Sequence, residues 1–90
     1  MPEVSVIIPT INRRTLLNQS INSVINQSFK NWELFIVNDS TEEILLNQSD
    51  PRIHLVENQL LPGANGARNT GINLSSGNYI AFLDDDDTWN

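Results

Sequence analysis

The sequence has no cysteine, a single lysine and a single histidine among its 90 residues. Without cysteine, a disulfide framework, a thiolate zinc site and a cysteine nucleophile are all excluded. The five basic residues are scattered and are outnumbered by eleven acidic ones, which gives a net charge of −6 and a pI of about 4.3. This balance argues against nucleic-acid binding, which needs a basic face. No apolar run approaches the length of a transmembrane helix, and we expect a cytoplasmic protein.

Apolar residues make up 39% of the chain and occur in regular runs, which indicates one small globular domain. Four runs rich in apolar residues, the first of them β-branched, predict strands: residues 4–8, 32–37, 52–57 and 79–83. The segments between them predict three helices: residues 13–27, a short helix that starts at Ser40, and residues 64–76. The order β-α-β-α-β-α-β predicts an α/β fold, a mainly parallel sheet with flanking helices and right-handed crossovers.

Local signals support the second and third helices. Ser40 followed by Glu43 is a capping box, which predicts a helix start. The inner positions of the third helix are small, Ala67 and Gly71 among them, so we expect it to pack closely on the sheet. Gly77 suits the left-handed residue that ends such a helix.

Polar clusters follow three of the predicted strands, at residues 10–12, 38–40 and 84–87. The carboxyl ends of parallel strands meet at one edge of a sheet, and ligands of such sheets bind there. We therefore expect these three clusters to lie together and to form the binding site.

Residues 84–87 are four consecutive aspartates at the end of an apolar strand. Two such charges ~5 Å apart repel by roughly 3 kcal/mol at an effective dielectric constant near 20, so a bound cation would stabilise them. Oxygen ligands suit Mg²⁺ or Mn²⁺, which is often shared with substrate phosphates. The alternative is a solvated surface turn.

Several single residues have two interpretations. Asp39 is a helix-capping acid or a nucleotide contact, and Arg68 is a solvated side chain or a partner of the carboxylates or of a diphosphate. His54 is expected on an edge strand without a functional role. Trp32 and Trp89 are expected to pack in the core.

Two other classes of protein place acids at parallel strand ends. A non-catalytic nucleotide- or metal-binding module is the main alternative. A receiver-like signalling domain needs an acidic pair after the first strand and a lysine late in the fold. Here the first strand ends in Pro9 and Thr10, and the only lysine is Lys30, so the receiver is disfavoured.

Five segments together resemble family-2 glycosyltransferases, which have the GT-A nucleotide-sugar fold. They are residues 4–13, 23–34, 37–40, 63–72, which carry an Ala-Arg-Asn helix motif, and 77–87, which lead into an Asp-x-Asp motif. They occur in the family's order and at similar spacing, and together they cover nearly the whole chain. The family usually has tyrosine in place of Ile11 and an acid in place of Asn38.

The resemblance implies inverting transfer of a sugar from a nucleotide diphosphate sugar, most often UDP-linked, to an acceptor hydroxyl. A Mn²⁺ or Mg²⁺ ion would bridge the two phosphates and stabilise the leaving diphosphate. A carboxylate base would take the proton of the acceptor hydroxyl. The resemblance assigns nucleotide binding to Pro9, Thr10, Asp39, Arg68, Asp84 and Asp85, and the metal ion to Asp84 and Asp86.

Domains of the family are more than twice as long, and their base and acceptor site follow the acidic motif. We therefore expect residues 1–90 to be the N-terminal, nucleotide-sugar-binding half of such a domain, inactive in transfer by themselves. The catalytic base would lie beyond Asn90, and the parent enzyme would work in the cytoplasm or at the cytoplasmic face of a membrane. The strand at residues 79–83 would then be an open apolar edge through which copies self-associate.

Overall fold

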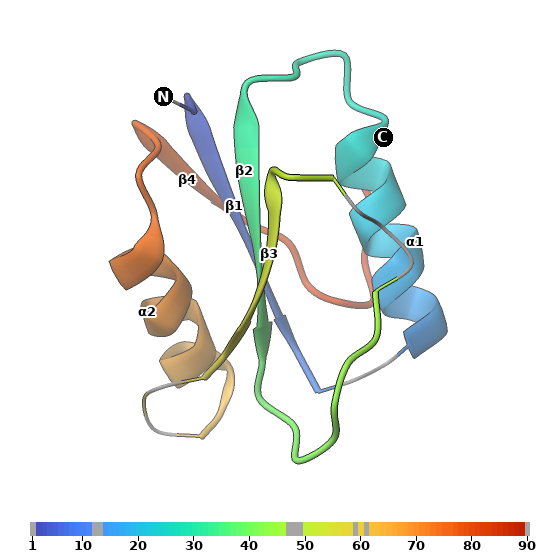
Figure 1. Ribbon diagram of the computed structural model, residues 1–90, viewed down its shortest axis with the longest axis vertical. Coiled ribbons are helices and arrows are strands. Elements are labelled where there is room, and N and C mark those ends of the chain that lie inside the picture. The colour runs from blue at the N-terminus through green and yellow to red at the C-terminus, as the bar shows by residue number, and fades with distance from the viewer. Residues whose placement is uncertain (1, 12–13, 47–49, 59, 61, 90) are drawn as a thin grey trace.

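The computed structural model describes residues 2–11, 14–46, 50–58, 60 and 62–89. All four of its strands are parallel and pair in the order β3-β2-β1-β4. Helix α1 lies on one side of the sheet and α2 on the other (Figure 1). In chain order the elements are β1 (Val4–Thr10), α1 (Arg14–Ile25), β2 (Trp32–Asn38), β3 (Ile53–Glu57), α2 (Ala64–Leu74) and β4 (Tyr79–Phe82).

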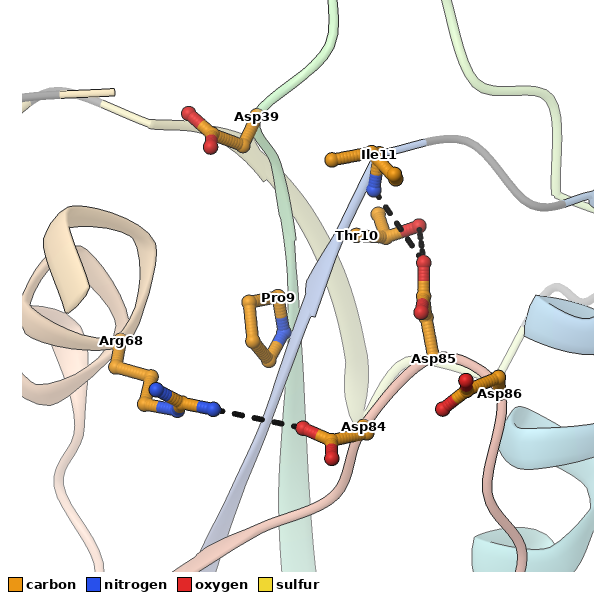
Figure 2. A pocket seen from close by; sticks show the side chains of 8 residues that line it. All are labelled: Pro9, Thr10, Ile11, Asp39, Arg68, Asp84, Asp85 and Asp86. Atoms are coloured by element: carbon orange, nitrogen blue, oxygen red, sulfur yellow. Dashed lines mark hydrogen bonds and ion pairs between the residues drawn. The ribbon is translucent and has the colours of Figure 1, made fainter. Parts of the chain in front are cut away.

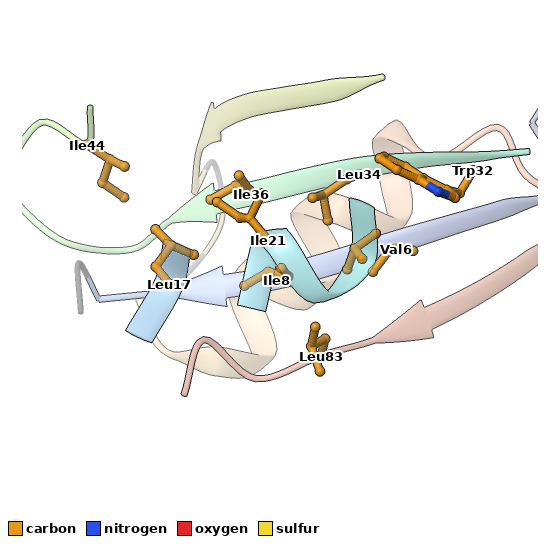
Figure 3. Close-up of a cluster of buried hydrophobic side chains, with 10 residues drawn as sticks. Val6, Ile8, Leu17, Ile21, Trp32, Leu34, Ile36, Ile44 and Leu83 are labelled. Carbon is orange, nitrogen blue, oxygen red and sulfur yellow. The ribbon is translucent and has the colours of Figure 1, made fainter. Parts of the chain in front are cut away.

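The larger part of the core lies between the sheet and α1 (Figure 3). Alternate residues of β1 and β2 point to this face, because side chains of a strand alternate between its two sides. Each fully buried Val, Leu or Ile side chain contributes roughly 1.5–3 kcal/mol to stability. The buried members of this cluster are Val6, Ile8, Leu17, Ile21, Val24, Trp32, Leu34, Ile36, Ile44 and Leu83.

The opposite face packs against α2 through a smaller cluster of Ile7, Phe35, Val37 and Ala67. A Cβ atom at Gly71 would lie 2.6 Å from Cγ2 of Ile7, so a larger residue does not fit between helix and sheet there. The prediction that small residues bring this helix close to the sheet is confirmed.

The predicted strands and the helices α1 and α2 are confirmed, but the helix predicted from Ser40 is wrong. Residues 39–46 form bends and irregular structure, and residues 47–49 lie outside the described residues. Oδ1 of Asn38 accepts hydrogen bonds from the backbone N–H and the hydroxyl of Ser40, at 2.9 and 2.6 Å. Its Nδ2 donates to the carbonyl oxygen of Glu42 at 2.8 Å. A side chain that engages the backbone in this way competes with helix formation.

The conformation predicted for Gly77 is also wrong. Of the described glycines only Gly63 has a positive φ, 115°. Gly77 is required for a different reason, because a Cβ atom there would lie 2.7 Å from both the backbone nitrogen and Oγ of Ser5. The glycine therefore allows the chain to pass close to the start of β1 before β4 begins.

Strand β4 forms one edge of the described sheet and pairs with β1 alone. Its side chains Tyr79, Ile80 and Phe82 are exposed, which confirms the predicted open apolar edge; self-association there remains a prediction. His54 lies on β3 at the other edge, where its ring stacks on Phe35 with centroids 5.1 Å apart. Neither described helix has the length and hydropathy needed to cross a membrane.

Candidate functional site

Members of all three polar clusters meet at the carboxyl end of the sheet, as predicted. They line a pocket of about 230 Å³ together with the first turns of α2 (Figure 2). The lining contains every residue that the sequence singled out for nucleotide or metal binding. It consists of Pro9, Thr10, Ile11, Asp39, Arg68, Asp84, Asp85 and Asp86.

Asp85 is the buried member of the acidic run, with 6% of its surface exposed. Its Oδ2 accepts a hydrogen bond from the hydroxyl of Thr10 at 2.8 Å and one from the backbone N–H of Ile11 at 3.3 Å. These contacts fasten the loop after β4 to the end of β1. They explain how one aspartate of the run is accommodated inside the fold.

Helix α1 holds the same loop from the other side. The hydroxyl of Ser20, which is fully buried, donates to the carbonyl oxygen of Asp87, and Oγ of Ser23 accepts from the backbone N–H of Trp89 at 3.0 Å. The acidic loop is thus fixed by side chains of β1 and α1 before any ligand binds. Trp89 packs against the core cluster on the α1 face and Trp32 is buried in it, as predicted.

Asp84 and Asp86 are exposed carboxylates at the pocket. Asp84 forms an ion pair with Arg68, whose Nη2 lies 3.5 Å from Oδ1 of the aspartate. The Asp84 side chain is 64% exposed and that of Arg68 34%, and such pairs contribute about 0–1 kcal/mol. Both partners are therefore available to a ligand at small cost. The structure supports Arg68 as a partner of the carboxylates rather than a purely solvated side chain.

The donor set fits a divalent cation that is shared with a ligand. No group of three His, Cys, Asp or Glu side chains with metal-binding geometry occurs among the residues described. Magnesium-type sites commonly use one or two carboxylates, with water and substrate phosphates as the other ligands. Asp84 and Asp86 supply that number of hard oxygen donors at the pocket.

Asp39 is held at the pocket by three hydrogen bonds. Its Oδ1 accepts from Nδ2 of Asn58 and its Oδ2 from the backbone N–H of Gly63, each at 2.7 Å. Its backbone N–H donates to the carbonyl oxygen of Thr10 at 2.9 Å. Gly63, whose φ is 115°, is the residue directly before α2. Through this hydrogen bond Asp39 contacts the start of α2, and it does not cap a helix that directly follows β2.

Sequence reasoning missed two residues at the site. Ile11 lines the pocket; it stands within the cluster of residues 10–12, but the sequence alone assigned it no binding role of its own. Asn58 supports Asp39, and it directly follows β3. The rule that polar residues after parallel strands mark the site, extended to β3, would find Asn58. Of the expected polar residues, Asn12 lies outside the described residues, and Asn38 and Ser40 bond to each other and to Glu42.

Comparison with known proteins identifies the family of this chain. The sequence model of Glycosyl transferase family 2 matches residues 5–90, so the chain belongs to that family. The UDP-Glc:alpha-D-GlcNAc-diphosphoundecaprenol beta-1,3-glucosyltransferase WfgD of Escherichia coli is 43% identical over 90 residues. That match covers 96% of this chain and 36% of WfgD, so the chain spans about a third of this relative's length.

Solved structures show the same fold. A crystal structure of S. aureus TarS 1-349 in complex with UDP-GlcNAc aligns with a TM-score of 0.76 at 24% identity, over 98% of this chain and 28% of that one. The mannosyltransferase PcManGT from Pyrobaculum calidifontis, in complex with GDP-Man and Mn²⁺, aligns with a TM-score of 0.77 at 23% identity and the same coverage. The described sheet and helices are therefore the N-terminal part of a GT-A glycosyltransferase fold.

Proposed function

We propose that this chain forms the nucleotide-sugar side of an inverting glycosyltransferase that uses a UDP-linked donor. The observation that carries the proposal is the composition of the pocket: four carboxylates and one guanidinium meet at the carboxyl ends of parallel strands. A diphosphate would be repelled by this excess of negative charge unless a divalent cation bound with it. The complexes of TarS with UDP-GlcNAc and of PcManGT with Mn²⁺ support this choice of ligands.

The pocket residues divide into two groups in this proposal. Asp84 and Asp86 hold the Mn²⁺ or Mg²⁺ ion, which when bound acts as a Lewis acid for the leaving diphosphate. Arg68 leaves its weak pair with Asp84 to meet a phosphate oxygen. We assign Pro9 and Asp39 to the base and ribose: in Figure 2 Asp39 lies away from Arg68 and Asp84, and Pro9 lies between Asp39 and that pair.

Asp85 and Thr10 act differently from the two metal ligands. Their side chains bond to each other, so they shape the pocket chiefly by holding the acidic loop against β1. None of these pocket residues is assigned as the base that takes the proton of the acceptor hydroxyl. Because the chain spans about a third of WfgD, donor binding rather than turnover is the activity to test in these 90 residues.

The relatives also suggest an acceptor class. The name of WfgD specifies a UDP-glucose donor and a sugar acceptor linked through diphosphate to undecaprenol. We extend that class to the enzyme to which this chain corresponds: a sugar hydroxyl on a polyprenol-linked diphosphate, met at the cytoplasmic face of a membrane. Competition between such acceptors in a transfer assay of a full-length family member that carries these 90 residues would test it.

Calorimetric titration of the purified chain with UDP, with and without Mn²⁺, tests the proposal. We expect binding that depends on Mn²⁺, and an affinity at least roughly tenfold lower in Asp86→Asn, which is about 1.4 kcal/mol. Asp87→Asn is the matched control, because it removes the same charge from the same loop at a residue outside the pocket lining. Equal losses in both variants, or binding indifferent to Mn²⁺, would refute the proposed metal site.

A further inference from the structure

A network of hydrogen bonds, to which the proposed function assigns no role, supports Asp39 from behind. Asn58, the residue that follows β3, donates from Nδ2 to Oδ1 of Asp39 at 2.7 Å. On its other side, Oδ1 of Asn58 accepts from the hydroxyl of Thr70 at 2.8 Å and from the backbone N–H of Leu60 at 3.1 Å. The amide therefore has defined partners on both of its polar atoms.

This network connects three elements that meet beside the pocket: the ends of β2 and β3, and α2. The backbone N–H of Asn58 donates to the carbonyl oxygen of Asn38 at 2.9 Å, which joins the end of β3 to the end of β2. Thr70 is 3% exposed and lies on α2, the helix that also carries Arg68 into the pocket. Asp39 is thus positioned by a side chain that is itself anchored on a buried hydroxyl.

The direction of the amide is set by these partners. Thr70 and Leu60 both present donors to Oδ1, so Nδ2 is the atom left to face the Asp39 carboxylate. The backbone N–H of Gly63 takes the second oxygen of that carboxylate. With one donor on each oxygen, the plane of the carboxylate is fixed, while each oxygen keeps a lone pair for a ligand.

We propose that Asn58 is a positioning residue for nucleoside recognition, holding the Asp39 carboxylate at the angle from which it contacts the base and ribose. The inference rests on the proposed function, because it requires that Asp39 faces the nucleoside part of UDP. It assigns no catalytic role to Asn58. Preorganisation of this kind improves affinity by removing the cost of ordering a side chain on binding.

A double-mutant cycle in the purified chain tests this inference, with UDP and inorganic pyrophosphate as the two probes in the presence of Mn²⁺. We expect Asn58→Ala to lower the affinity for UDP roughly tenfold and to leave that for pyrophosphate unchanged, since pyrophosphate has no nucleoside. In an Asp39→Ala background the same substitution should change UDP affinity less than about twofold. If the role of Asn58 were purely structural, Asn58→Ala would lower the affinity for both probes alike, and the loss would persist in the Asp39→Ala background.

Two further variants and the unmodified chain complete the design. If Asn58→Ala does not fold, Asn58→Asp keeps the acceptor for Thr70 but replaces the donor that faces Asp39 with a carboxylate oxygen that repels it, and it should show the same selective loss of UDP affinity. Thr70→Ser, which keeps the hydroxyl, should retain affinity. Undiminished UDP binding by Asn58→Ala would overturn the inference alone. Failure of the unmodified chain to bind UDP would overturn the proposed function and, with it, this inference.

Discussion

The two ends of the sheet both carry carboxylates, but they use them in opposite ways. At the amino end, Oε2 of Glu33 accepts from the hydroxyl of Ser5 at 2.5 Å, from the backbone N–H of Ser76 at 2.7 Å and from its hydroxyl at 3.0 Å. At the carboxyl end, Asp84 has an exposed ion pair at 3.5 Å. Glu33, with three protein donors on one oxygen, stabilises the fold, whereas Asp84, with one long and exposed ion pair, is available to a ligand.

The ionisation of the amino-end carboxylates agrees with that division. Burial raises the pKa of Glu33, but hydrogen bonds from Ser5 and Ser76 outweigh it, and the net effect is a pKa below the usual value of 4.5. Asp50, just before β3, has a pKa lowered to about 2, chiefly by hydrogen bonds from the Arg52 side chain. The same arginine lies 3.8 Å over the ring of Trp32. These acids are therefore committed to local structure.

The largest expected loss of stability is that of Gly77→Ala, which disrupts the amino end of the sheet. The new Cβ would lie 2.7 Å from backbone and side-chain atoms of Ser5, the residue that donates to Glu33. Because a backbone atom cannot easily move away, we expect a loss of about 2–3 kcal/mol in the free energy of unfolding, measured with denaturant. Asn78→Ala, an exposed neighbour, should change it by less than about 0.5 kcal/mol.

The UDP affinity of Gly77→Ala provides the measurement that could contradict the independence of the two ends of the sheet. UDP affinity of the folded Gly77→Ala protein, measured well below its unfolding transition, should equal that of the parent chain. A loss of affinity in proportion to the loss of stability would show that the two ends of the sheet are not independent.

A smaller effect is expected from Glu33→Gln, which keeps the shape and removes the charge. Hydrogen bonds to a charged acceptor contribute more than those to a neutral one, so we expect a loss of about 1 kcal/mol at pH 7. The pKa of Glu33 is lowered on folding, so its contribution is present above pH 4.5 and is lost as the pH falls through the folded-state pKa. The difference between the parent and Glu33→Gln should therefore shrink on acidification. Glu43→Gln, which removes one negative charge at an exposed position, is the control for charge removal.

The smallest effect is expected at Asp50. Its pKa is lowered from 3.8 to about 2, so its pairing with Arg52 stabilises the fold above pH 3.8 and is lost as the pH falls toward 2. Both side chains are partly exposed, so we expect Asp50→Asn to cost less than about 1 kcal/mol at pH 7. Unfolding temperatures of the parent and Asp50→Asn should converge between pH 4 and pH 2. Convergence centred above pH 4 would contradict the lowered pKa of this carboxyl.

The sequence predicted those features that depend on local pattern. Apolar runs located the four strands, and the small residues Ala67 and Gly71 indicated the close packing of α2 that Ile7 requires. The rule for parallel strand ends, which needs only the order of strands and helices, correctly predicted that Asp39 and Asp84 share one pocket.

The features that failed depend on partners distant in sequence or on competing local bonds. Gly77 is determined by Ser5, 72 residues earlier, which no local window contains. Ser40 has the sequence of a helix cap, but Oδ1 of Asn38 accepts hydrogen bonds from both its backbone N–H and its hydroxyl. The support of Asp39 by Asn58 and Gly63 likewise required the ends of β2, β3 and α2 to be placed side by side.

One titration tests the division between the two ends most directly: UDP in the presence of Mn²⁺ against Asp84→Asn and Glu33→Gln, measured side by side with the parent chain. Each variant removes one negative charge. We predict at least roughly tenfold weaker binding in Asp84→Asn, and an affinity in Glu33→Gln within about twofold of the parent. Equal affinity of Asp84→Asn and the parent, or an equal loss in both variants, would contradict the assignment of the carboxyl-end pocket to the nucleotide.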